Sequence, residues 1–118
     1  MSQKIQSTKN KSVFTYHHPA GFTREVVFVV NTYASNGNLY VGLEEAHTGD
    51  LFTDVTKNIE KLGGHLVNIK NTDENDGMAQ FLIDNRMGTL LGTMDEQYPM
   101  FLFDAHNLAT ANRISDKK

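Results

Sequence analysis

The sequence predicts one small α+β domain, in which a twisted, mainly antiparallel β-sheet carries one main α-helix packed on it. The chain has 118 residues, 39% of them hydrophobic, which is enough for one modest core. Most apolar runs are short, rich in β-branched and aromatic residues and bounded by turn residues, as strands are. A single stretch, after Asn71, changes to helical spacing of its apolar residues.

The domain is expected to span residues 13–104, between two terminal segments. Residues 1–12 contain one apolar side chain after the first methionine, Ile5, so we expect a flexible N-terminal arm. Residues 105–118 can begin as a short helix but end in polar residues. We expect them to form a C-terminal tail that is partly disordered.

A β-hairpin is the clearest local unit of the domain. Arg24–Tyr33 is dominated by β-branched and aromatic residues, which indicates a buried central strand. The pair Asn36-Gly37 supplies the positive φ of a tight turn, and Leu39–Glu44 alternates as the return strand. A short strand at Val13–Tyr16 precedes the hairpin.

Shorter strands are expected in the second half of the chain. The register of the strand at Leu51–Thr56 stays open, because either Leu51, Thr53 and Val55 or Phe52 alone can face the core. The other expected strands are His65–Ile69, Thr89–Thr93 and Met100–Phe103.

One helix is expected at Glu74–Met87. Residues 71–76 concentrate capping side chains and acids, which favour a helix N-terminus. Gly88 follows at a position suited to end the helix. The apolar residues that share one face at helical spacing are Met78, Phe81 and Leu82.

Composition excludes several classes of protein. The chain has no cysteine, which excludes disulfides and thiolate metal sites. The N-terminal segment lacks the apolar run of a secretory signal, and no apolar run approaches the roughly 20 residues of a membrane span. We therefore expect a cytoplasmic protein that does not bind a membrane.

The net charge of −3 is unevenly distributed along the chain. Residues 44–104 contain twelve acids and four bases, whereas residues 1–43 contain one acid and four bases and residues 105–118 one acid and three bases. The acidic middle block disfavours direct binding of DNA or RNA, whose phosphates are bound mainly by Lys and Arg. A bacterial protein with a basic surface is the expected partner.

No motif indicates catalysis, a cofactor or a metal. Adjacent histidines on a strand point to opposite faces, and no H-E-x-x-H pair is present. The Asp73–Gly77 run lacks the ligand spacing of a calcium loop, and helix capping accounts for it. We expect no catalytic residue and no cofactor, while an enzyme that uses a carboxylate pair stays open as an alternative. The sets that come nearest to metal ligation are His17-His18 with Asp50, and His47 with Glu44 and Glu45.

Acidic side chains at turns and strand ends are the strongest remaining signal. An ordinary solvated surface accounts for them equally well. Alternatively, some line up as a negative face that occupies a Lys/Arg groove of a protein that handles nucleic acid. The candidate partner-binding residues are Glu44, Glu45, Asp50, Asp54, Asp73, Glu74 and Asp76.

Three stretches carry a resemblance to a family: Asn31–Leu43, Phe81–Thr93 and Tyr98–Phe103. In order and spacing they resemble an uncharacterised domain family of small proteins carried by plasmids, integrative elements and phages of Gram-positive bacteria. The resemblance covers about residues 24–104 and brings no catalytic residues. Lys57 departs from the family pattern, which leaves a strand boundary open there.

The resemblance implies a context rather than a mechanism. Small acidic proteins of such elements often resemble inhibitors of host defence. Together with the acidic block, this suggests a non-enzymatic anti-CRISPR protein that binds Cas9 with its guide RNA and blocks nucleic-acid binding. The alternative is an accessory interaction protein of a conjugative or other mobile element, with no inhibitory role, which binds through a sheet edge or as a homodimer.

Overall fold

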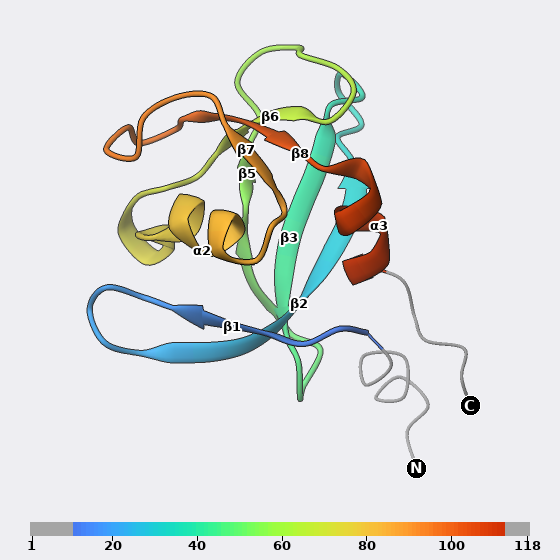
Figure 1. The fold of residues 1–118 in the computed structure, drawn as a ribbon. Coiled ribbons are helices and arrows are strands. Elements are labelled where there is room, and N and C mark those ends of the chain that lie inside the picture. The colour runs from blue at the N-terminus through green and yellow to red at the C-terminus, as the bar shows by residue number, and fades with distance from the viewer. Residues whose placement is uncertain (1–10, 113–118) are drawn as a thin grey trace.

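The protein folds into two four-stranded antiparallel sheets with short helices at their margins (Figure 1). The computed structural model describes residues 11–112. The mixed α and β class is confirmed, but the expected single sheet with one main helix is corrected to two sheets and two short α-helices. The strand orders are β1-β2-β3-β4 and β5-β6-β8-β7. In chain order the elements are β1 (Phe14–His17), β2 (Thr23–Thr32), β3 (Leu39–Glu45), β4 (Leu51–Asp54), β5 (Thr56–Lys57), β6 (Leu66–Ile69), the 3-10 helix η1 (Asp73–Asn75), α2 (Met78–Asp84), β7 (Gly88–Leu90), β8 (Met100–Phe103) and α3 (Ala105–Asn112).

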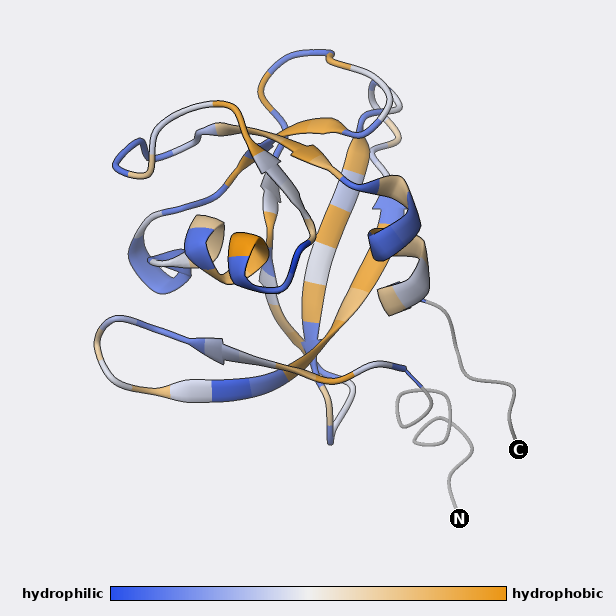
Figure 2. Ribbon diagram, in the orientation of Figure 1, coloured by the Kyte–Doolittle hydropathy of each residue, from blue (hydrophilic) through white to orange (hydrophobic). Residues whose placement is uncertain are grey.

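The β2–β3 hairpin forms the centre of the first sheet, as the sequence predicts. Its turn closes through Gly37, whose backbone φ is 78° and whose N–H donates to the carbonyl of Tyr33 at 2.8 Å. Val26 and Phe28 of β2 are fully buried on the face toward the second sheet. Hydrophobic bands alternate along β3 in Figure 2, as expected for a strand with one buried face.

The chain passes from the first sheet to the second at Val55. A bulge between Leu43 and Glu44 shifts the register of β3 against β4, so Leu51 is left 62% exposed while Thr53 and Val55 are buried. The N–H of Val55 donates to Val41 of the first sheet, and its carbonyl accepts from Lys70 at the end of β6. The expected strand Leu51–Thr56 is therefore divided into β4 and β5, because this corner belongs to both sheets.

The second sheet places β8 between β6 and β7. Phe101 and Phe103 of β8 are buried with ring centroids 5.0 Å apart. Gly88 lies in β7 and does not end a helix as expected. A Cβ at this position would collide with the carbonyl oxygen of Leu102 and the ring of Phe101, so only glycine allows β7 to approach β8.

The helix expected at Glu74–Met87 is wrong in its extent. Its apolar stripe is buried as expected, but α2 covers only Met78–Asp84, and η1 precedes it as a separate turn. Gly77 separates the two with φ 82°, and Arg86 ends the helical region with φ 60°. Capping residues therefore build a compact loop here, with its own backbone turn, instead of the first turn of α2.

The segment beyond residue 104 begins with α3, which packs its Leu108 and Ala111 into the core. Lys11 lies beside α3, where its Nζ donates to the carbonyl of Phe28 at 3.1 Å and to Oδ1 of Asn112 at 3.3 Å. Residues 1–10 and 113–118, which make up most of the expected arm and the end of the expected tail, lie outside the described residues. Within the described range, no helix has the length and hydropathy to cross a membrane.

Candidate functional site

The loop that carries η1 is fixed by two buried side chains. Asn75 is fully buried: its Oδ1 accepts from the hydroxyl of Thr53 and its Nδ2 donates to the carbonyl of Asp54, both at 2.7 Å. From the other side, the buried hydroxyl of Tyr16 donates to the carbonyl of Asp76 at 2.5 Å. The sequence predicted capping residues here. Nothing in the sequence indicated that Asn75 reaches into the corner between the sheets.

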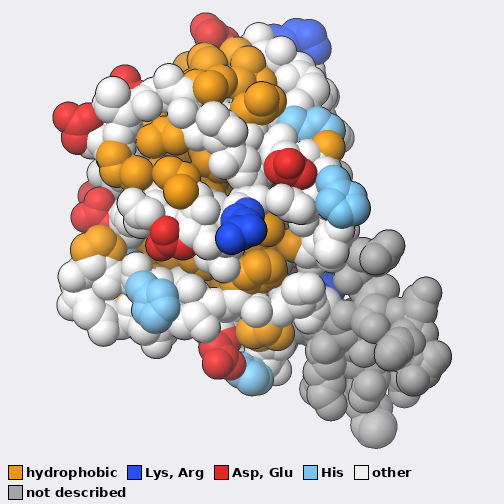
Figure 3. Space-filling view, viewed as in Figure 1, with side chains coloured by type: hydrophobic (Ala, Val, Ile, Leu, Met, Phe, Trp, Pro, Cys, Tyr) orange, Lys and Arg blue, Asp and Glu red, His pale blue; other side chains and the backbone are white. Residues whose placement is uncertain are grey.

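Because the backbone of this loop is held from inside, its acids point outward. Asp73, Glu74 and Asp76 are exposed, and Asp54 is exposed at the end of β4, whose carbonyl Asn75 binds. We call Asp54, Asp73, Glu74 and Asp76 the acidic rim. Figure 3 shows acidic side chains along the side of the molecule where Figure 1 has the η1 loop and the β7–β8 connection.

One base lies at the acidic rim. Lys70 Nζ is 2.7 Å from Glu74 Oε2, and no other ion pair of a rim residue occurs in the described part of the chain. Hydrogen bonding to Lys70 lowers the pKa of Glu74, and hydrogen bonding to Glu74 raises the pKa of Lys70, with a further increase from the charge of Asp54. With four carboxyl groups and one base, the rim has an excess of acidic side chains.

Asp54 also joins the rim to the outer face of the first sheet. The hydroxyl of Tyr40 donates to Asp54 Oδ1 at 2.6 Å, and the Tyr40 ring covers Gly42 on the same face. Burial raises the pKa of Tyr40, and the hydrogen bond to Asp54 raises it further. Tyr40 therefore stays protonated and keeps the Asp54 carboxylate in place.

The other three candidate acids lie at the far end of β3. Glu44 shares the sheet face of Gly42 and Asp54, whereas Glu45 and Asp50 have separate surroundings. Glu44 and Glu45 are consecutive in β3, so their side chains point to opposite faces of the sheet. Glu45 Oε2 is 3.3 Å from Nε of Arg24, which also lies over the rings of Phe22 and Phe52. Asp50 lies in the turn that follows, where its carbonyl accepts from the N–H of Glu45. The seven predicted residues therefore do not form one continuous acidic face.

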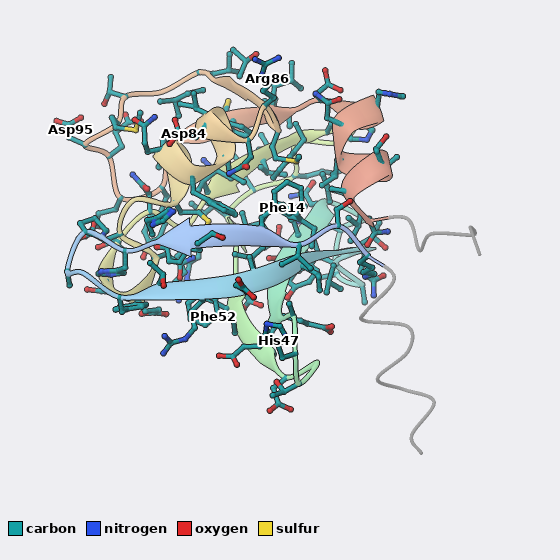
Figure 4. All side chains as sticks on the ribbon, turned by 60° about the horizontal axis from the view of Figure 1, so that its bottom comes forward. Phe14, His47, Phe52, Asp84, Arg86 and Asp95 are labelled. Carbon is teal, nitrogen blue, oxygen red and sulfur yellow. The ribbon has the colours of Figure 1, made fainter. Side chains whose placement is uncertain are left out.

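The histidines weighed as metal ligands have other partners. The ring of His18 stacks on Phe22, and its Nδ1 accepts from the N–H of Ala20 at 2.9 Å. His47 Nε2 is 2.6 Å from Glu25 Oε1, and Figure 4 labels His47. From Lys11 to Asn112, no group of three or more metal-ligating side chains is found.

A hollow between β1 and α2 is the feature that the sequence did not indicate. It has a volume of about 550 Å³ and lies between Phe14 of β1 and Phe81, Gln80 and Asp84 of α2. Figure 3 shows hydrophobic side chains in the space between these two elements, and Figure 4 shows Phe14 and Asp84 on its two sides. Volumes of this size are typical of sites that enclose part of a ligand. The hollow arises from the packing of segments that are far apart in the sequence.

Comparisons with protein-family models, with curated proteins and with solved structures found no match to this chain.

Proposed function

We propose that this protein is a protein-binding inhibitor that presses its acidic rim against a basic, nucleic-acid-binding surface of a bacterial defence nuclease, with Cas9 and its guide RNA as the first target to test. The observation that supports this proposal best is the construction of the acidic rim. Three exposed carboxylates stand on a loop whose backbone is fixed by Asn75 and Tyr16, a fourth lies beside it at the end of β4, and Lys70 is the paired base among the described residues.

A rim of this kind suits recognition of a Lys/Arg surface. Its carboxylates accept charge-assisted hydrogen bonds, which are stronger than neutral ones. Because the loop is already ordered, binding does not need to order it. Its negative potential also speeds the encounter with a positive groove and disfavours acidic partners. While the rim occupies the Lys/Arg groove of the nuclease, the phosphates of a nucleic acid cannot bind there.

The experiment compares two variants with the same change in net charge. Asp73→Asn, Glu74→Gln and Asp76→Asn together remove three of the four carboxylates of the rim and leave Asp54, which binds Tyr40. Asparagine at position 73 tolerates the positive φ of 57° found there. The control variant neutralises the exposed acids Glu25, Glu60 and Asp104, which lie in β2, in the β5–β6 connection and before α3, outside the rim.

Purified protein is added to Cas9 and guide RNA before target DNA, and binding and cleavage are measured at low and moderate salt. The original protein and the control variant are expected to bind and to inhibit cleavage, more strongly at low salt. The rim variant is expected to bind at least about tenfold more weakly, since close charge pairs across an interface contribute roughly 1.5 kcal/mol or more. Equal loss in the two variants would show a general charge effect and reject the rim as the contact surface.

The accessory-protein alternative is favoured by a different observation: within residues 11–112, no strand pairs with the outer edge of β1. An element-encoded partner or a second copy of the chain can pair with such an edge. Absence of Cas9 binding at both salt concentrations, with stable co-purification of another protein of the element, would support this alternative in place of the inhibitor.

A further inference from the structure

The outer edge of β1 has backbone groups that no other residue from Lys11 to Asn112 pairs with. Antiparallel neighbours alternate between hydrogen-bonded and non-hydrogen-bonded pairs. At the hairpin end, the backbone N–H of His18 donates to the carbonyl of Phe22, so these two residues form a hydrogen-bonded pair. Tyr16 and Arg24, two positions further along the ladder, form the next such pair. The backbone N–H and C=O of Tyr16 therefore point toward β2, and those of Thr15 and His17 point away from it. Glu25, which lies opposite Thr15, accepts from Ala46 on the β3 side, which confirms this alternation.

Three residues of this segment therefore direct their N–H and C=O groups away from β2: Val13, Thr15 and His17. None of them forms a further backbone hydrogen bond within the described range. Thr15 and His17 are exposed, and Val13 is 50% exposed. An edge of this kind is a template for one more strand.

The hollow lies directly along this edge. Val13, Thr15 and His17 line it on the β1 side, and Gln80, Phe81 and Asp84 line it on the α2 side. An edge strand that faces a helix across an apolar hollow is the arrangement in which extended peptides add to a sheet and place alternate side chains in pockets. The hollow therefore offers both backbone partners and a place for side chains.

The two ends of the hollow differ. At the end near Gly77, the ring of Pro19 and the carbonyl of His17 come within 4 Å of the place that a Cβ would take, so β1 and α2 approach closely. At the other end a second hollow of about 260 Å³ continues from the first and shares Phe14 and Asn85 with it. The two hollows therefore give an extended segment a path from the Gly77 end toward Arg86.

Charge along the groove follows an order. Asp84 lines the first hollow, where its Oδ1 accepts from Nε2 of Gln80 and the carboxylate stays exposed. Arg86 lines the second hollow, beyond Phe14. Figure 4 labels Asp84 and Arg86 and shows that they project in different directions from the end of α2.

We propose that an extended segment of a partner protein adds to β1 as an additional strand in this groove, with a basic side chain toward Asp84 and an acidic side chain toward Arg86. Antiparallel pairing is the more frequent geometry. It places the basic residue before the acidic residue in the partner's sequence. A second copy of β1 suits the groove less well, because Phe14–His17 contains no Lys, Arg, Asp or Glu.

The first test uses the full chain and two short peptides with blocked ends, Thr-Val-Lys-Val-Glu-Val-Thr and the same residues in reverse order, because residues two apart on a strand share one face and lie about 6.6 Å apart. Amide NMR shifts and hydrogen exchange are followed during titration to millimolar peptide. The first peptide is expected to shift the amides of residues 13–17 and 80–86 and to slow exchange of the Thr15 N–H at least about tenfold. The reversed peptide is expected to bind about fivefold or more weakly. No shift at β1 with either peptide would overturn the proposal.

The second test uses two matched pairs of variants. Thr15→Pro removes the outward N–H at an edge position, where proline costs no bond to β2, and is expected to abolish binding. Thr15→Val keeps this N–H and is expected to bind as the original protein does. Asp84→Lys is expected to lose the preference between the two peptides, whereas Glu60→Lys, with the same charge change far from the groove, is expected to keep it.

Two outcomes separate the possible occupants and surfaces. If exchange at Thr15 slows as the protein concentration rises without peptide, and Thr15→Pro removes this effect, then a second copy occupies the groove and the proposed partner segment is wrong. The rim variant with residues 73, 74 and 76 neutralised is expected to bind the first peptide normally. If the acidic rim does not bind Cas9, the proposal for the groove is unaffected. If the peptide does not bind the groove, the proposal for the acidic rim is unaffected.

Discussion

Among the described residues, three buried asparagine side chains fix loops that regular secondary structure does not hold. Each is buried and uses both its amide donor and its carbonyl acceptor. Each binds at least one backbone group and at least one further polar group, so its loss leaves several groups without a partner. Asn75 binds Thr53 and Asp54, Asn71 binds the carbonyls of Met94 and Glu96 and the N–H of Ala79, and Asn38 binds Asn58, the carbonyl of Glu60 and the N–H groups of Leu62 and Gly63.

Asn75→Ala is expected to lower the free energy of unfolding by about 2–4 kcal/mol, because two buried hydrogen bonds are lost and the hydroxyl of Thr53 and the carbonyl of Asp54 are left unsatisfied. Urea titration followed by circular dichroism measures the change. Asn31→Ala, at an exposed asparagine, is expected to stay within about 0.5 kcal/mol of the original protein. If Asn75→Ala and Asn31→Ala lower the free energy of unfolding by similar amounts, the burial of Asn75 does not determine its contribution to stability.

Tyr16 is expected to make stability depend on alkaline pH. Burial raises its pKa above the ordinary value of about 10, and the charges of Asp76 and Glu74 raise it further. The folded protein therefore holds the phenol proton more tightly than the unfolded chain. This contribution is complete below pH about 10 and is lost as pH rises toward the folded pKa.

Tyr16→Phe tests this dependence. At neutral pH the variant is expected to be less stable by about 1 kcal/mol, from the lost hydrogen bond to Asp76. Above pH about 10 its stability is expected to fall less steeply than that of the original protein, so the difference narrows. Tyr98→Phe, whose hydroxyl binds no other described residue, is the control and is expected to follow the original curve. Parallel curves for Tyr16→Phe and the original protein would contradict the prediction.

Local chemistry was predictable from the sequence at this scale, but long-range contacts were not. The sequence identifies residues 71–76 as capping and turn-forming residues, and they do form turns. It does not identify Asn75 as the member that turns inward, because its partner Thr53 lies 22 positions earlier in the chain. For the same reason, the exposure of Asp73, Glu74 and Asp76 was predictable while their proximity to Asp54 was not.

At the scale of elements, the alternation of apolar residues with period 2 predicted the strands well. The helical spacing of apolar residues, with period 3.6, predicted only the centre of the helix. β8 has the predicted bounds, β2 differs from prediction by one residue at each end, and β3 differs by one residue at its C-terminal end. Strand periodicity is a local property that survives packing. The division of the chain at Val55 is a property of two sheets together and leaves no local signal.

Gly77→Ala is expected to destabilise the junction between η1 and α2. Gly77 has φ 82°, and an added Cβ would lie 3.1 Å from Cδ of Pro19. The backbone conformation alone costs an L-residue about 1–2 kcal/mol. The contact with Pro19 adds to this cost, so the total loss in the free energy of unfolding is expected to exceed 2 kcal/mol, about the upper limit for backbone strain alone.

Gly63→Ala is the matched control for this prediction. Gly63 has nearly the same φ, 84°, but open space where the Cβ would lie. Its loss of stability therefore measures backbone strain alone, and the difference between the two variants in urea measures the contact with Pro19. Equal losses would show that β1 and α2 do not approach closely at this end of the groove.

At the scale of the whole molecule, the sequence predicted the mixture of α and β structure and the charge of the middle block, but not the partition into two sheets. Strand periodicity shows which side chains of a strand are buried and not which sheet buries them. Likewise, the acidic block of residues 44–104 predicted a negative potential without showing that Glu45 pairs with Arg24 while Asp54 joins the η1 loop. The groove beside β1 depends on the same packing and had no sequence signal.

Lys70→Gln is expected to strengthen binding to a basic partner, because it removes the base that is paired at the acidic rim. The Lys70–Glu74 pair is partly exposed, with 30% of the Lys70 side chain and 55% of the Glu74 side chain accessible, so its loss is expected to cost at most about 1 kcal/mol of stability. The association rate is expected to rise about two- to fivefold at low salt and to return to the original value at high salt, because screening suppresses the added potential. Stopped-flow measurements give the association rate at low and at high salt. The control is Lys61→Gln, which removes an exposed base bound to the carbonyl of Asn36. If the two variants accelerate association equally, net charge governs the encounter, and the acidic rim has no special part in it.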